Sequence, residues 1–375
     1  MTEMTGGIRW RIDSGTYLLW KKVFSDMSGR SEASAPAGMS DDNFINFLVR
    51  EKIAPYYYFK CNGQGNIGDR TFLKQELERY YYQFVAANLL FRKEAIEVLK
   101  ILNNEGLKPI LFKGLQLQKE LYPLPELRPT SDLDLVVRRD EDFGHAMELL
   151  ENMGYEKFSY RSDGYARNIL KEIVFMPPAG RKIMVELHHS LRYGKWDKRK
   201  DFDEPFLNDE NIHDCEDNGA EYLAMNDNLN YLFLSYHAFE SHIGMNKILW
   251  INDLRLLKDK TDTDIERLAE ATDTMRSYRF GLRLQKDMSG EESPVHCFVE
   301  DGYTAEMAAG AKIAAEFANV DGICRKVMWL KWFLFPDVDY LRKKYGAAGR
   351  SFLLIYFKHF TGILKGLLRM GKVHE

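Results

Sequence analysis

The sequence has few cysteines, no excess of positive charge and no long apolar run, and each shortage argues against a class of protein. Its 375 residues include four cysteines, at positions 61, 215, 297 and 324, whose spacing fits neither a disulfide scaffold nor a structural zinc site. Scattered free thiols are typical of the reducing cytoplasm. The formal net charge of −4 argues against general nucleic-acid binding, which normally requires a basic surface.

No apolar run approaches the roughly 20 residues that a membrane-spanning helix needs. The first residues, MTEMTGGI, lack the basic start and apolar centre of a secretory signal. We therefore expect a cytoplasmic protein. The segment from Ser351 to Met370 combines apolar with basic residues at helical spacing, a pattern that also occurs in helices lying on anionic membranes. For this segment we favour a packed terminal helix over peripheral membrane or partner contact.

The length of the chain predicts more than one structural unit, because a single hydrophobic core rarely extends beyond about 250–300 residues. Hydrophobic residues make up 45% of the sequence, enough for a substantial core. The pattern of elements predicts an N-terminal helical region over 1–105, a catalytic core over 106–195 and a C-terminal helical region over 196–375. The fold class is α+β, with a small mixed sheet flanked by helical units. Residues 196–219 are polar and predict a connector.

Residues 63–68 match the G-x-G-x-x-G pattern of dinucleotide-binding proteins. The context argues against that function. The preceding segment is aromatic and contains Pro55, and the following helix is predicted to run from Thr71 to about Asn103, far longer than the crossover of a compact βαβ unit. We interpret these residues as a loop.

Two carboxylates stand at the start of a β-branched strand in the stretch TSDLDLVV, residues 130–137. Side chains alternate along a strand, so Asp132 and Asp134 project to one face, and Leu133, Leu135 and Val137 to the other. Two close carboxylates repel each other unless a cation lies between them, and oxygen ligands suit Mg²⁺ or Mn²⁺. A Ser-Asp sequence is also common in ordinary turns. The neighbouring segments therefore decide between a metal site and a simple acidic turn.

The segments on either side of this strand strengthen the metal interpretation. Upstream, residues 108–114 form an apolar strand that ends at Gly114, and a helix follows; such a turn lets backbone amides approach a phosphate. Downstream, residues 182–188 form a second apolar strand, which contains Glu186 and, on the same face, His188. Glu186 therefore offers a third carboxylate. Between the helix that follows Gly114 and the acidic strand, residues 122–129 form a proline-rich loop with Arg128 at its end.

These pieces, in this order, resemble the nucleotidyltransferase superfamily to which polymerase β belongs. The sequence is most similar to a bacterial branch described as uncharacterised nucleotidyltransferases. The matching motifs are Phe112–Gly114, Leu121–Pro123, Arg128, Asp132–Val137, Gly154–Tyr155 and Val185–His188. The superfamily usually has Gly-Ser at the turn, whereas this chain has Lys113–Gly114, and the interval from Gly114 to Asp132 is longer than in polymerases.

The resemblance implies a metal-dependent enzyme that moves a nucleoside monophosphate from an NTP to an acceptor. The predicted catalytic residues and metal ligands are Asp132, Asp134 and Glu186, which would hold two Mg²⁺ or Mn²⁺ ions. The predicted nucleotide contacts are Lys113, Gly114, Arg128, Ser131 and His188. The sequence does not identify the acceptor.

Two alternatives, and four further candidate residues, accompany this interpretation. The altered turn allows a catalytically inactive module that binds a nucleotide or a protein partner, although such a module has no need of three converging carboxylates. The pair His188–His189 suggests zinc, but it lacks the H-E-x-x-H spacing and its two rings point apart on a strand. Four further residues match the resembled family, with core packing as the favoured role: His237, His242, Trp250 and Asp253.

Overall fold

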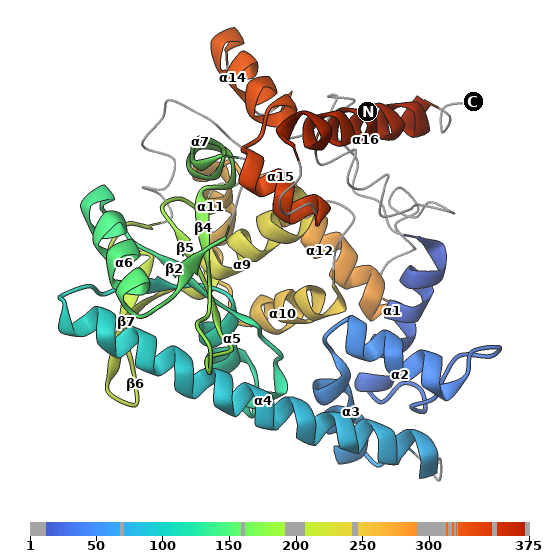
Figure 1. The fold of residues 1–375 in the computed structure, drawn as a ribbon. Helices are drawn as coiled ribbons and strands as arrows, with labels where there is room; N and C mark the ends of the chain where they lie inside the picture. Colours follow the sequence, from blue (N-terminus) through green and yellow to red (C-terminus); the bar gives the residue numbers. More distant parts are fainter. Residues whose placement is uncertain are drawn as a thin grey trace.

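The structure is a computed structural model, and it describes residues 13–67, 71–158, 162–191, 207–241, 247–290, 313, 317–318, 320, 322–346 and 351–371. It shows the predicted mixture of a sheet and flanking helices (Figure 1). The helices before the sheet are α1 (Ser14–Met27), α2 (Asp41–Arg50), α3 (Ala54–Gly63) and α4 (Thr71–Asn104). The long helix α4 has the predicted extent, and it runs from α2 and α3 to strand β7 (Ala220–Met225).

The glycine-rich stretch from Gly63 follows helix α3, and not a strand. A dinucleotide-binding turn joins a strand to a helix, so the structure removes that alternative for the described residues; Gly68 lies outside them. Ser40 caps α2, since its hydroxyl accepts a hydrogen bond from the amide of Asn43 at 3.3 Å.

Within the described residues, the sheet has the strand order β3-β4-β5-β2-β1-β7-β6. The strands are β1 (Ile110–Leu111), β2 (Asp132–Val136), β3 (Glu156–Lys157), β4 (Glu172–Met176), β5 (Met184–His188), β6 (Ile212–Asp217) and β7. Strand β2 is parallel to β5 and antiparallel to β1, and β1 is parallel to β7. The sequence pattern of residues 169–176 and 181–187 predicts a hairpin, and β4 and β5 form it, although residues 169 and 170 belong to a helical turn where the pattern predicts a strand.

The prediction of a connector over residues 196–219 is wrong for its second half, because Ile212–Asp217 form strand β6 and pair with β7. The turn between them is Asn218–Gly219, with φ values of 50° and 78°. Asn-Gly is the strongest short-range signal of a hairpin. The prediction overlooked this turn signal because the charged residues of β6 resemble those of a loop. Such charges also suit an exposed edge strand.

One face of the sheet is apolar and covered. Leu133, Leu135 and Val185 pack there against α4 and against α6 (Asp140–Asn152), as the alternation predicts. The opposite face is apolar only in part, where Phe112 and Val136 pack against α9 (Asp227–Tyr236). The charged residues of β2 and β5 lie on this second face. The sheet therefore presents the predicted site residues away from its main core.

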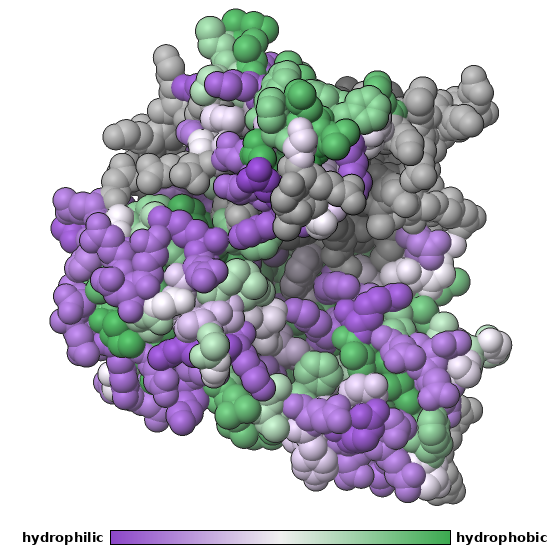
Figure 2. All heavy atoms as spheres, in the orientation of Figure 1, coloured by the Kyte–Doolittle hydropathy of each residue, from purple (hydrophilic) through white to green (hydrophobic). Residues whose placement is uncertain are grey.

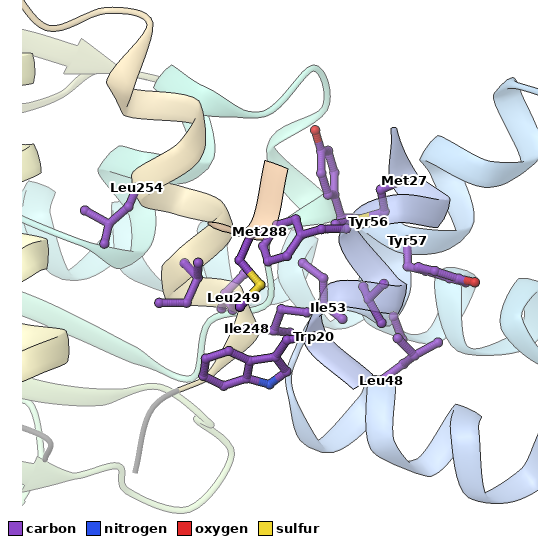
Figure 3. Packing of buried hydrophobic residues seen from close by; sticks show 14 of the residues in the cluster. Trp20, Met27, Leu48, Ile53, Tyr56, Tyr57, Ile248, Leu249, Leu254 and Met288 are labelled. Atoms are coloured by element: carbon purple, nitrogen blue, oxygen red, sulfur yellow. The ribbon is translucent and has the colours of Figure 1, made fainter. Parts of the chain in front are cut away.

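The helices that follow β1 surround the sheet and extend beyond it. They are α5 (Gly114–Leu121), α6, α7 (Asp163–Tyr165), α9, α10 (Ile248–Lys258), α11 (Ile265–Ala271), α12 (Met275–Ser289), α14 (Ile323–Leu334), α15 (Val338–Tyr345) and α16 (Phe352–Gly371). Helices α10 and α12 pack on the N-terminal helices in one shared core, in which Trp20 lies near Ile248 and Met288 (Figure 3). The predicted N-terminal and C-terminal helical regions are therefore joined by a common set of buried side chains.

Helix α16 packs on α15 through Ile355, and His359 is also buried. Several apolar side chains of α14 and α16 are exposed, among them Ile323, Leu353 and Phe357. Figure 2 shows hydrophobic residues gathered over these helices, at the top of the view. No helix in the described part of the chain is long and apolar enough to cross a membrane.

Candidate active site

The turn between β1 and α5 brings the chain into close contact with β2. A Cβ atom at Gly114 would lie 3.0 Å from the hydroxyl oxygen of Thr130 and 3.3 Å from the carbonyl oxygen of Asp132. The residue before it, Lys113, has φ 60° and ψ −134°, a conformation that glycine adopts readily and other residues rarely. The turn thus has glycine where the space is tight, and a lysine where the backbone would favour glycine.

The two acidic strands align so that their carboxylates converge. Asp134 of β2 stands opposite Glu186 of the parallel strand β5, and Asp132 stands opposite Met184. Opposite residues of paired strands share a face, so Asp132, Asp134 and Glu186 project to the same side. The ammonium of Lys113 lies 3.0 Å from Oδ1 of Asp134; the Asp134 side chain is buried, and that of Lys113 is largely enclosed.

His188 and Glu172 complete the cluster. Nε2 of His188 lies 3.6 Å from Asp134 Oδ1 and 3.7 Å from Glu186 Oε2, and Nδ1 lies 3.6 Å from Glu172 Oε2. We did not predict Glu172. It stands opposite His188 in the antiparallel pair of β4 and β5. The two-residue alternation of side chains along this hairpin places Glu172 and His188 on one face, and this was the signal that could have identified it.

Burial and mutual charge shift the titration of this cluster. Burial alone would raise the pKa of Asp134, but Lys113 and His188 together hold that pKa well below its usual range. Burial, followed by the charge of Asp134, raises the pKa of Asp132. Burial also raises the pKa of Glu186. Burial alone would lower the pKa of His188, but contact with Asp134 and Glu186 raises it to about 9, so the ring is protonated at neutral pH.

The cluster fits a divalent cation. One ligand atom from each of Asp134, Glu186 and His188 lies within 4.8 Å of the others. The Nε2 atom of His188 is buried, has no hydrogen bond at normal distance and faces two carboxylates, so the protonated ring pairs with them by charge and would have to lose its proton to act as a ligand. Asp132 lies outside this group of three, at the start of the same strand face. Carboxylate oxygens favour Mg²⁺ or Mn²⁺ over softer metals.

A lysine in the turn between α2 and α3 reaches the acidic strand. Nζ of Lys52 lies 3.2 Å from the hydroxyl of Ser131, and its charge acts on Asp132. Its neighbour Glu51 is buried and accepts a hydrogen bond from the amide of Ile248 at 3.0 Å, which fixes the start of α10. Lys52 was not predicted, because it is 79 residues from Ser131 and no local motif marks it.

The guanidinium of Arg128 is bonded to Asp253 of α10, while its charge also acts on Asp132. This guanidinium is buried and bonds both carboxylate oxygens of Asp253, with Nη2 2.8 Å from Oδ2 and Nε 3.1 Å from Oδ1. Asp253 also accepts a hydrogen bond from the hydroxyl of Tyr122 at 2.7 Å. The structure therefore brings together two residues that the sequence singled out separately, and it joins the proline-rich loop to α10.

Aromatic contacts connect the site to α9 and α10. The ring of Phe112 contacts the rings of His188 and Phe233, with centroids 4.9 Å and 5.2 Å apart. His237 stacks on Phe233 at 6.0 Å and meets Trp250 edge-on at 5.1 Å. His237 and Trp250 thus pack behind the site, whereas His242 lies outside the described residues.

The fold and the site define an α+β protein with a strand-turn-helix unit beside a carboxylate-lined sheet face. The model of a family described as uncharacterised nucleotidyltransferase matches residues 38–288, more than half of the chain, and the protein belongs to this family. A search of curated proteins finds no match. Among solved structures, an antigenic nucleotidyltransferase-like protein from Paracoccidioides brasiliensis is similar at 14% identity and a TM-score of 0.38, over 56% of this chain and 94% of that chain.

Proposed function

We propose that the protein transfers a nucleoside monophosphate from an NTP to a hydroxyl or related acceptor, with Mg²⁺ or Mn²⁺ as cofactor, as a bacterial member of the polymerase β superfamily. The observation that carries this proposal is the convergence of Asp132, Asp134 and Glu186 on one sheet face beside the Lys113–Gly114 turn. The three carboxylates would hold the two cations that the resemblance implies. Bound there, such cations neutralise phosphate charge and lower the pKa of the attacking hydroxyl.

The side chains of the protein have separate tasks in this reaction. The acceptor oxygen bonds to the α-phosphorus, the bond to pyrophosphate breaks, and the acceptor proton passes to Glu186. Burial raises the pKa of Glu186, which makes its carboxylate a better base than an exposed one. Lys113 and His188 are cations within the cluster, suited to the charge that develops on the leaving pyrophosphate.

The remaining predicted contacts bind or position the nucleotide. Gly114 opens α5, whose first backbone N–H groups can donate hydrogen bonds to a phosphate. Ser131 and Lys52 lie together at the exposed side of Asp132, where they can hold a phosphate. Arg128 acts through the loop that precedes β2, because its guanidinium is bonded to Asp253.

Calorimetric titration of ATP, GTP, CTP and UTP into the protein, with and without Mg²⁺, tests this function. We expect one nucleotide to bind only with the metal, and we expect the double variant D132N/D134N to lose that binding. D132A should then lose metal-dependent turnover with the bound nucleotide as donor. A folded protein that binds none of the four nucleotides would contradict the proposal and favour a non-catalytic module.

A further inference from the structure

Lys113 places a positive charge where a metal ion would have to bind. Its ammonium lies 3.0 Å from Asp134 Oδ1, and the charges of Glu186 and Asp132 also act on it. The side chain is 14% exposed. The ammonium also lies 5.0 Å and 5.8 Å from the ring centroids of Phe112 and Phe233, which enclose it on the apolar side. The lysine is therefore held inside the acidic cluster and does not extend into solvent.

The backbone of Lys113 is strained in this position. A non-glycine residue rarely adopts φ 60° and ψ −134°, and such strain persists only where other interactions hold it. The ion pair with Asp134 and the contacts with the rings of Phe112 and Phe233 hold Lys113 in place. If Lys113 merely balanced charge, the same charge could be supplied from an unstrained position. The strained turn indicates that a lysine is needed at this place.

We propose that the ammonium of Lys113 is a place-holder: in the nucleotide-free protein it occupies a cation position of the carboxylate cluster, and it moves to the phosphates when the nucleotide and its metal bind. The inference rests on the proposed function and adds to it the order in which Lys113 and then the metal occupy the carboxylate cluster. An ammonium and a divalent cation repel each other and compete for the same oxygens of Asp134. Triphosphate oxygens provide the anionic partner that the ammonium needs on leaving Asp134.

The test measures Mn²⁺ binding without nucleotide, by electron paramagnetic resonance of free Mn²⁺, in wild type, K113M and K113G. Removal of the competing charge should lower the Kd for Mn²⁺ about tenfold or more, the size of a typical coupling between competing ligands. K119M is the matched control, because Lys119 lies on α5 outside the cluster and bonds only the carbonyl oxygen of Glu216 among the described residues. Its Kd should equal that of wild type.

An unchanged Mn²⁺ affinity in both Lys113 variants would overturn the inference. If K113M fails to fold, K113G is the test, because glycine suits the backbone of the turn. The rise in melting temperature on adding Mn²⁺, larger in K113G than in wild type, is the second readout. Wild type that binds an NTP with Mg²⁺ while the variants keep wild-type Mn²⁺ affinity would refute the place-holder alone. Tighter Mn²⁺ binding by the variants, with no NTP binding by wild type, would refute the proposed transfer reaction and the move to the phosphates, and would leave Lys113 as an occupant of the cation position.

Discussion

Gly114 is the residue at which the turn and the acidic strand approach most closely. The nearest atoms to an added Cβ are a hydroxyl oxygen at 3.0 Å and a backbone oxygen of Asp132 at 3.3 Å. The backbone oxygen belongs to β2 and can move only if the start of that strand moves with it. A methyl group at Gly114 would therefore displace the strand that positions Asp132 and Asp134.

We expect Gly114→Ala to lower the free energy of unfolding by about 1–3 kcal/mol, as overpacking does, and to weaken nucleotide binding. Urea unfolding and calorimetry measure the two effects. Gly144→Ala is the control: this glycine is exposed within α6, no atom lies within 4 Å of an added Cβ, and alanine there should stabilise the helix by about 0.5–1 kcal/mol. Equal stability changes in the two variants would show that the turn is not tightly packed.

At the scale of elements, the Arg128–Asp253 pair ties the proline-rich loop to α10. The exposed fractions of the two side chains are 5% and 0%, so each buried charge has the other as its ion-pair partner. Asn252 adds a hydrogen bond to the hydroxyl of Tyr122 at 3.0 Å, which extends the polar network. The loop that enters β2 is thus fixed by a helix that follows it by more than 100 residues.

We expect Arg128→Met to cost about 3–5 kcal/mol of stability, because it leaves the buried carboxylate of Asp253 without its cation. The double variant R128M/D253L removes both charges and should recover much of that loss. Chemical denaturation of wild type, the single variant and the double variant measures both. A loss below about 1 kcal/mol in R128M would mean that the pair is not the main restraint on the loop.

At the scale of the whole molecule, the helices before and after the sheet share one core. Trp20 of α1 is 1% exposed and lies among side chains of α10 and α12 (Figure 3). Residues far apart in the sequence thus exclude water together, and this core adjoins the loop and helix that support the site. We expect the two helical regions to unfold with each other rather than separately.

Trp20→Ala should lower the free energy of unfolding by about 3–5 kcal/mol, the usual cost of removing a large buried side chain. Leu18→Ala on the same helix is the matched control, because Leu18 is 64% exposed and its loss should cost under about 0.5 kcal/mol. Circular dichroism during urea unfolding measures both. Similar losses in the two variants would show that α1 does not contribute to the shared core.

The sequence was most informative where the signal is local. The alternation in residues 132–137 predicted both faces of β2, and the periodicity from Thr71 predicted α4. The hairpin of β4 and β5 was predicted as well, whereas β6 was missed because its charges resemble those of a loop. Charge patterns separate exposed from buried segments, but they do not separate an edge strand from a connector.

Local sequence determined that Asp132, Asp134 and Glu186 project from strands, and that a glycine turn precedes them, because side-chain direction follows from backbone geometry. Only the tertiary structure decided that Asp134 stands opposite Glu186, that Arg128 pairs with Asp253, and that Lys52 reaches Ser131. Strand order, register and long-range ion pairs depend on how the whole chain packs, which no short window of sequence contains.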